Sequence, residues 1–112
     1  MFERRKYERF QLAMDAVCPR TADQNKIKVD NISQEGLAIT SDRSVSPGVE
    51  VELEILIPGG TCPVVAKGQI VWINDHEIEG HSEYKIGVKL RDKDQGWLFG
   101  CLREKWMRFK SS

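Results

Sequence analysis

The chain of 112 residues and 12.8 kDa has the size of a single domain, with no room for a second one. Charged residues make up 30% of it and the set AVILMFWYC 40%, which is typical of a soluble globular protein and excludes collagen-like, disulfide-scaffold and disordered chains. Seventeen Lys/Arg balance seventeen Asp/Glu, and this neutral total argues against a general binder of nucleic-acid polymers, which usually carries a basic surplus.

The charges are distributed unevenly along the chain. Residues 1–20 contain five Lys/Arg and three Asp/Glu, residues 21–90 contain six and eleven, and residues 91–112 contain six and three. Basic ends therefore flank an acidic middle. The neutral total does not exclude a local site for a small anion.

The sequence lacks the features of a membrane or secreted protein. No apolar stretch approaches the ~18 residues that a membrane span needs, and the basic N-terminal residues are not followed by the apolar segment of a signal peptide. Cys18, Cys62 and Cys101 form no CxxC pair and are odd in number, so they predict neither a zinc site nor a disulfide framework. We therefore expect a cytoplasmic protein with reduced thiols and no membrane insertion.

Polar and apolar residues alternate with a period of two over most of the chain, which predicts half-buried β-strands. In chain order, the expected strands are residues 10–18, 27–30, 37–39, 49–57, 64–73 and 84–90. Turn-forming residues separate strands at 31–36, 46–48 and 58–60. Gly68 predicts a bulge or sharp bend within a strand, and residues 74–82 predict a polar, acidic loop. The pattern favours a mainly β, six-stranded antiparallel barrel, because closure removes exposed edges.

The C-terminal residues have helical periodicity instead. Asp94 is expected to cap a helix that runs from about residue 95 to residue 110. Its apolar stripe consists of Trp97, Leu98, Cys101, Leu102, Trp106 and Phe109. The stripe predicts a helix packed on the barrel, and the alternative is that part of it forms a homodimer or a face for a partner protein.

The first group of candidate binding residues is Arg4, Arg5 and Arg9, which precede the first strand. A guanidinium group is planar, offers five donors, matches a phosphate bidentately and is the commonest partner of the O6/N7 edge of guanine. The alternative is a solvated terminus that binds no ligand.

The second group is Asn31, Ser33 and Gly36, in the turn after the second strand. An amide can pair with a base edge or a ribose, a hydroxyl can donate to phosphate, and a glycine permits close backbone approach or a positive φ. The alternative is an ordinary turn between two strands.

The two groups together are more informative than either one alone. The order Arg5-x-x-x-Arg9, then about twenty residues, then Asn31-x-Ser33-x-x-Gly36 resembles the PilZ domain family. That family has an RxxxR stretch ahead of a six-stranded barrel and a [D/N]xSxxG motif on the barrel. The resemblance covers residues 4–92, and the other similar patterns are Pro47-Gly48, residues 68–72 and residues 86–88.

PilZ domains bind cyclic di-GMP, a bacterial second messenger, and the resemblance implies the same ligand here. It implies that Arg5 and Arg9 clasp guanine and phosphate, with a further contact from Arg4. It also implies that Asn31 and Ser33 hydrogen-bond the same groups from the barrel, while the Gly36 turn sits close to the ligand. The implied organisation is a flexible arginine-bearing segment at residues 1–9, a PilZ-type barrel at 10–92 and a packed helix at 93–112.

Two functional classes follow from these observations. The leading expectation is a stand-alone receptor that relays ligand binding to an unidentified downstream protein, with residues 1–9 becoming ordered around the ligand. The alternative is a protein–protein adaptor with weak or no nucleotide binding. The arginines and the Asn/Ser/Gly turn favour the receptor, since an adaptor needs neither.

Catalysis and metal binding are not expected. His76 and His81 bracket an acidic stretch, but their spacing matches no standard set of metal ligands. The sequence contains no nucleophile–base arrangement, no paired acids in a recognisable motif and no phosphate-cradling glycine loop. We therefore expect a non-enzyme that needs no cofactor beyond the ligand cyclic di-GMP.

Overall fold

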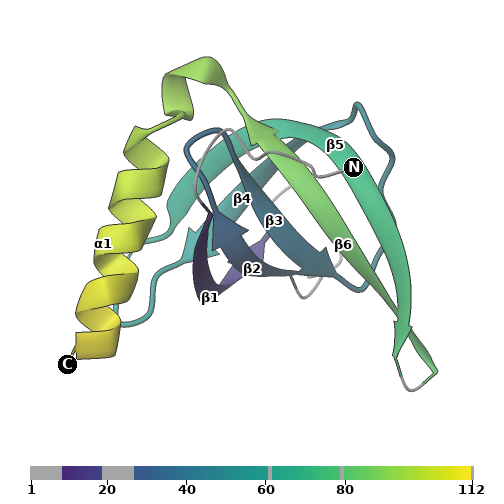
Figure 1. Cartoon of the computed structure of the whole chain (residues 1–112), viewed down its shortest axis with the longest axis horizontal. Helices are drawn as coiled ribbons and strands as arrows, with labels where there is room; N and C mark the ends of the chain where they lie inside the picture. The colour runs from purple at the N-terminus through teal and green to yellow at the C-terminus, as the bar shows by residue number, and fades with distance from the viewer. Residues whose placement is uncertain (1–8, 19–26, 61, 79, 112) are drawn as a thin grey trace, which may run out of the picture.

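The computed structural model describes residues 9–18, 27–60, 62–78 and 80–111. Its elements are β1 (Phe10–Val17), β2 (Ile27–Ile32), β3 (Gly36–Ser41), β4 (Glu50–Leu56), β5 (Val64–Ile78), β6 (His81–Leu90), the short 3-10 helix η1 (Asp92–Asp94) and α1 (Trp97–Ser111). All strand pairs are antiparallel, and they close into a barrel in the order β1-β2-β3-β6-β5-β4 (Figure 1). The predicted mainly β fold with a C-terminal helix is confirmed.

The core of the barrel is made by the alternating residues that the sequence pattern indicated. In β1, for example, Leu12, Met14 and Ala16 are buried, whereas the residues between them are exposed. Strands β2 to β6 add further aliphatic side chains, and Leu53 and Ile55 are fully buried. Each such side chain contributes roughly 1.5–3 kcal/mol when it leaves water, so this packing is the main stabilising term of the fold.

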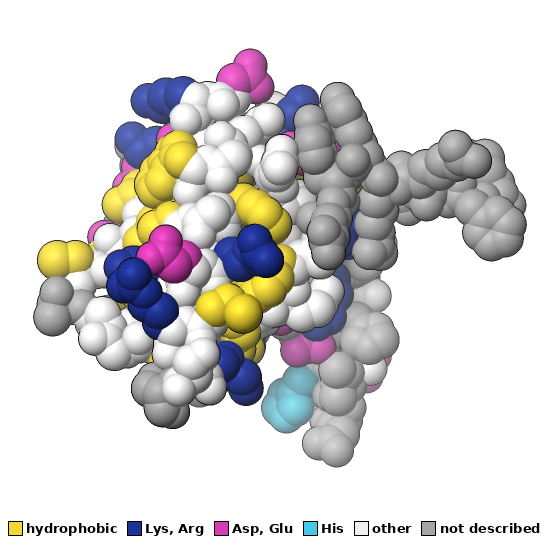
Figure 2. All heavy atoms as spheres, turned by 60° about the vertical axis from the view of Figure 1, so that its left-hand side comes forward, with side chains coloured by type: hydrophobic (Ala, Val, Ile, Leu, Met, Phe, Trp, Pro, Cys, Tyr) yellow, Lys and Arg dark blue, Asp and Glu magenta, His cyan; other side chains and the backbone are white. Residues whose placement is uncertain are grey.

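Helix α1 stands against one side of the barrel (Figure 1). Leu98 and Leu102 are fully buried, and the Arg103 guanidinium lies 5.7 Å from the centre of the Phe10 ring. The outer members of the predicted stripe differ, because Trp97 and Phe109 remain 52% and 47% exposed. Figure 2 shows this side of the molecule, where hydrophobic side chains stay visible among lysine and arginine side chains.

The prediction of a polar, acidic loop at residues 74–82 is wrong. Strand β5 runs to Ile78 and β6 begins at His81, and pairs such as Asp75 with Tyr84 continue the ladder into a hairpin that extends from the barrel (Figure 1). Gly80 supplies a positive φ of 80° at the tip. The hairpin lacks an alternating pattern because, away from the core, neither of its faces needs to be apolar.

Two smaller predictions also need correction. Asp94 does not cap the helix, since it belongs to η1. Gly96, with a φ of 82°, separates the two helices, and its carbonyl accepts the first helical hydrogen bond from the Gly100 N–H at 3.0 Å.

Gly68 does not form the bulge that was predicted, because it pairs regularly with Val51 and Leu90. A Cβ at Gly68 would overlap the carbonyl oxygen of the neighbouring strand, so this glycine allows close strand approach instead.

Candidate functional site

Four residues form a row across the outer face of the barrel, one on each of β2, β3, β6 and β5. Ala38 pairs with Asn31 on one side and with Gly87 on the other. Gly87 in turn pairs with Trp72. The chain neighbours of Ala38 and Gly87 are buried in the core, so these two positions face outward. In this row, the two small residues Ala38 and Gly87 therefore lie between the Asn31 amide and the Trp72 indole.

A β-bulge turns Asn31 toward this outer face. Strict alternation from Ile27 and Val29 would place Asn31 in the core. The pairing of β2 with β3 shifts between Val29 and Asn31, however, and leaves Asp30 as the extra residue. Asp30 and Asn31 are both half-buried, and the core pattern resumes at the fully buried Ile32. The bulge thus re-aims a polar side chain, as bulges beside functional sites often do.

A second bulge does the same for Trp72. The pairing of β5 with β6 shifts between Ile70 and Trp72, so Val71 is the extra residue and is 48% exposed. A Cβ built on Gly87 would overlap Nε1 and Cε2 of the indole. The indole therefore lies directly against the Gly87 backbone, and only glycine leaves room for it there.

The turn between β2 and β3 is held by backbone hydrogen bonds. The Ser33 N–H donates to the Gly36 carbonyl at 2.9 Å, and the Leu90 N–H donates to the Glu35 carbonyl at 2.9 Å. A Cβ at Gly36 would overlap the carbonyl oxygen of Val88 on β6. Of the two roles expected for Gly36, close backbone approach is the one it plays, and its φ is not positive.

Most of the predicted site residues meet at one cavity. Arg9, Asn31, Ser33 and Gly36 line a hollow of about 210 Å³, although Arg9 lies about twenty positions ahead of the turn in the sequence. Arg4 and Arg5 lie outside the described residues. The other residues that line the hollow are Glu35, Leu37, Ala38, Val71, Trp72, Gly87, Val88 and Lys89.

Among the lining residues that were not predicted from the sequence, Trp72 and Lys89 have side chains suited to binding a nucleotide. Trp72 was assigned to a strand, but the bulge that turns it outward leaves no obvious mark in the sequence. Lys89 could have been found, because the buried Val88 and Leu90 on either side of it place its ammonium group outside the barrel. With Arg9 it brings a second cation to the hollow, against the single carboxylate of Glu35.

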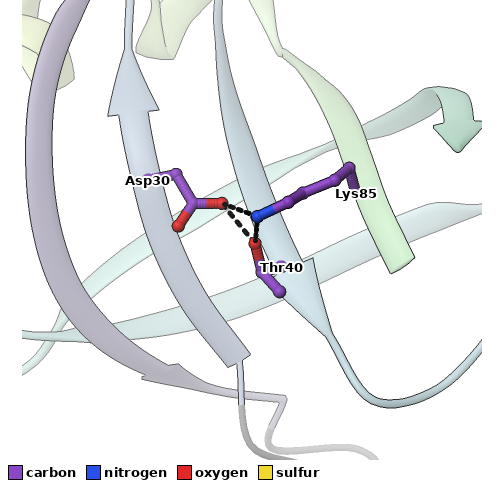
Figure 3. A network of polar contacts seen from close by, with 3 residues as sticks. All are labelled: Asp30, Thr40 and Lys85. Carbon is purple, nitrogen blue, oxygen red and sulfur yellow. Dashed lines mark hydrogen bonds and ion pairs between the residues drawn. The ribbon is translucent and has the colours of Figure 1, made fainter. Parts of the chain in front are cut away.

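A polar network beside the row holds the Asp30 bulge in place (Figure 3). The Lys85 ammonium group donates to the Thr40 hydroxyl at 2.8 Å and lies 3.7 Å from an Asp30 carboxylate oxygen. The Thr40 hydroxyl donates to the same carboxylate. This network joins β2, β3 and β6 across the outer face and fixes the side chain that precedes Asn31.

A larger hollow of about 1130 Å³ adjoins this network but is less suited to an anion. The carboxylates that line it are Asp15, Asp30, Asp42 and Glu83, against the two ammonium groups of Lys28 and Lys85. Size is therefore a poor guide in this molecule, and the smaller, more basic hollow is the better candidate for a nucleotide or phosphate.

The described residues offer neither a metal site nor a membrane-spanning helix. Within the part of the chain that the structure describes, no three His, Cys, Asp or Glu side chains come together to hold a metal ion. Among the described helices, none has the length and apolar character to cross a membrane.

Comparison with known proteins identifies the family. The model of the PilZ domain matches residues 3–100. The chain belongs to the PilZ domain family. No sequence among curated proteins matches this PilZ domain.

Solved structures share its fold, among them the following two. The PilZ domain with c-di-GMP of YcgR from Escherichia coli aligns with a TM-score of 0.71 and 10% identity, and covers 97% of this chain and 93% of that one. The inhibitor of motility MotI/DgrA from Bacillus subtilis aligns with a TM-score of 0.62 and 19% identity, and covers 96% of this chain. The match takes in 53% of MotI, so the present chain spans about half of that protein.

Proposed function

We propose that this PilZ domain binds cyclic di-GMP in the cavity between Arg9 and the turn of Asn31, Ser33 and Gly36, and relays binding to another protein. The observation that carries the proposal is that residues of two separate motifs line one hollow on the barrel surface. The family supports it, as does the similarity in fold to a PilZ domain whose structure contains c-di-GMP.

The chemistry of the cavity suits a ligand with two phosphates and two guanines. Arg9 offers a planar fork of donors for a phosphate or for the guanine edge, Arg5 would add a second fork from the same motif, and Arg4, which precedes the motif, would add a further contact. Asn31 would pair with a base edge, and the Ser33 hydroxyl would donate to a phosphate oxygen. Each charge-assisted contact is worth roughly 1.5–3 kcal/mol, so a few of them can hold a small dianion.

The row across the barrel adds a place for a base. A flat purine can approach the small Ala38 position beside the Trp72 indole, which covers Gly87 and provides an aromatic surface. Stacking of a base on an aromatic side chain is worth about 1–3 kcal/mol. The ammonium group of Lys89 lies at the same hollow and favours phosphate.

A backbone hydrogen bond between the β2–β3 turn and the residue before α1 supports the proposed relay of ligand binding. The Gln34 carbonyl accepts a hydrogen bond from the N–H of Gly96 at 3.0 Å, directly before α1. A ligand that moves the turn would therefore pull on the point from which the helix starts.

Isothermal titration calorimetry with cyclic di-GMP tests this proposal. We expect wild-type protein to bind, Arg9→Ala and Ser33→Ala to bind at least about tenfold more weakly, and the matched control Arg108→Ala on α1 to bind as wild type. Circular dichroism would verify that each variant is folded. No heat from folded wild-type protein at about 100 μM ligand would contradict the receptor function.

The second candidate is a protein adaptor with weak or no nucleotide binding. Exposed apolar side chains on α1, namely Trp97, Met107 and Phe109, favour it. The structural neighbour MotI is itself described as an inhibitor of motility. The same titration separates the two candidates, because an adaptor of this kind would give no heat with cyclic di-GMP.

A further inference from the structure

A groove separates the last turns of α1 from the connection between β4 and β5. It has a volume of about 550 Å³, within the range of sites that bind small molecules and peptide side chains. Ile57, Pro58 and Val64 line it from the barrel, and Phe109 lines it from the helix. It shares no lining residue with the proposed nucleotide cavity.

The groove exists because the apolar stripe of α1 continues past the residues that the barrel covers. Leu98, Leu102 and Phe109 lie on one face of the helix, at separations of four and seven residues. The two leucines are fully buried, whereas Phe109 is 47% exposed. An apolar surface that faces the barrel but is not filled by it is available to another side chain.

Basic side chains flank this apolar surface. Lys105 and Arg108 line the groove, and its described lining contains no carboxylate. The sequence of α1 contains four Lys/Arg and a single acid, Glu104, which pairs with Arg108 at 2.7 Å. Figure 2 shows lysine and arginine side chains around hydrophobic ones on the side that carries α1. Charge complementarity therefore selects an anionic occupant with an apolar part.

We propose that this groove binds an acidic peptide segment of a partner protein. An apolar side chain of the segment packs against Phe109, Ile57 and Val64, and a carboxylate beside it pairs with Lys105. A membrane fits the charge but not the shape, because a lipid surface cannot enter a groove bounded by a helix on one side and the Pro58 turn on the other. The inference extends the proposed function, since it gives the unidentified downstream protein a surface and a chemistry.

Fluorescence anisotropy with labelled synthetic peptides tests the proposal. The probe is a peptide of about twelve residues that alternates Leu or Phe with Asp or Glu, compared with one carrying Ser for the apolar residues and one carrying Lys for the acids. At about 50 mM ionic strength, only the acidic, apolar peptide should show saturable binding, which should weaken as salt is added.

Two variants locate the binding site. Lys105→Glu should weaken binding about tenfold, and Phe109→Ser should weaken it several-fold, whereas the control Lys28→Glu should bind as wild type because Lys28 lies on β2 beside the acidic hollow. On addition of the peptide, the amide chemical shifts of residues 57–60, 62–64 and 105–109 should change. Arg9→Ala should bind the peptide as wild type, so a failure of nucleotide binding and a failure of this groove are distinguishable.

Four outcomes would overturn the proposal. The first is that neither the acidic peptide nor its variants bind. The second is that the amide chemical shifts change only outside the groove, or that Lys105→Glu binds the acidic peptide as tightly as wild type. The third is that the protein sediments with phosphatidylglycerol vesicles but ignores the peptides. The fourth is a wild-type dimer in analytical ultracentrifugation that Lys105→Glu separates, which would assign the groove to a second copy of the chain.

Discussion

Replacement of Gly87 by alanine tests whether the Trp72 indole is seated against β6. The added Cβ would overlap Nε1 and Cε2 of the indole and lie 2.7 Å from Cδ1. The indole must therefore move away from the strand or the two strands must separate. Overpacking of this kind typically costs 1–3 kcal/mol, so we expect the free energy of unfolding to fall by about that amount.

A double-mutant cycle isolates the contact. In a Trp72→Ala background the three atoms nearest to the added Cβ are gone, so Gly87→Ala should be close to neutral or stabilise the fold by about 0.4–1 kcal/mol through the unfolded chain. Gly100→Ala is the control, because nothing lies within 4 Å of its Cβ and an alanine should stabilise the helix by up to ~1 kcal/mol. Urea unfolding followed by circular dichroism measures the stability of the wild type and of every variant.

Cyclic di-GMP titration of the same variants connects this packing to function. If Trp72 is displaced in Gly87→Ala, the variant should lose about as much affinity as Trp72→Ala does. Equal destabilisation by Gly87→Ala in both backgrounds would refute the seated indole. Unchanged affinity in both single variants would remove Trp72 from the proposed site.

Three further predictions concern the buried Leu102, the close approach at Gly36 and the ion pair of Lys85. Leu102→Ala should lower the free energy of unfolding by about 2–5 kcal/mol, because the Leu102 side chain on α1 is fully buried in the core, and a near-wild-type urea midpoint would contradict the packed helix. Gly36→Ala should lower both the thermal midpoint and the cyclic di-GMP affinity, because its Cβ meets a backbone oxygen that cannot turn aside; calorimetry and titration would check both. Lys85→Met should cost less than about 1 kcal/mol in urea unfolding, since Lys85 and Asp30 are 45% and 31% exposed, and a larger loss would mean that the network does more than orient Asp30.

The barrel could be predicted because its strands alternate cleanly between core and solvent. The pattern of β1 and the aliphatic run of β4 are enough to indicate half-buried strands, and their number favours closure. The hairpin at residues 74–82 could not be found in this way, because its strands leave the core and carry polar side chains on both faces. The hairpin is formed by backbone hydrogen bonds between β5 and β6, and the amino-acid sequence does not show such pairing.

The site could be predicted only in part from the sequence, because it depends on β-bulges that are formed by backbone pairing. Strict alternation assigns Asn31 to the core, and only the spacing from Val29 to Ile32, three residues where two are expected, indicates the bulge. For Trp72 even that mark is weak, since Ile70 to Ile73 reads as one β-rich run. Arg9 could be predicted as a candidate because arginines are dense in that segment, but its place at the cavity depends on where β1 enters the barrel.

The β2–β3 turn is joined to the residue before α1 by a main-chain hydrogen bond from the Gly96 N–H to the Gln34 carbonyl, and to β6 by another from the Leu90 N–H to the Glu35 carbonyl. Alanine scanning of Gln34 and Glu35 would therefore leave both bonds intact, although Glu35→Ala also removes a carboxylate from the proposed nucleotide cavity. Because the hydrogen bond to Gly96 does not use the Gln34 side chain, that side chain could change while the mechanical connection to α1 is kept. An amide-to-ester replacement at Gly96 would cut it without altering a single side chain.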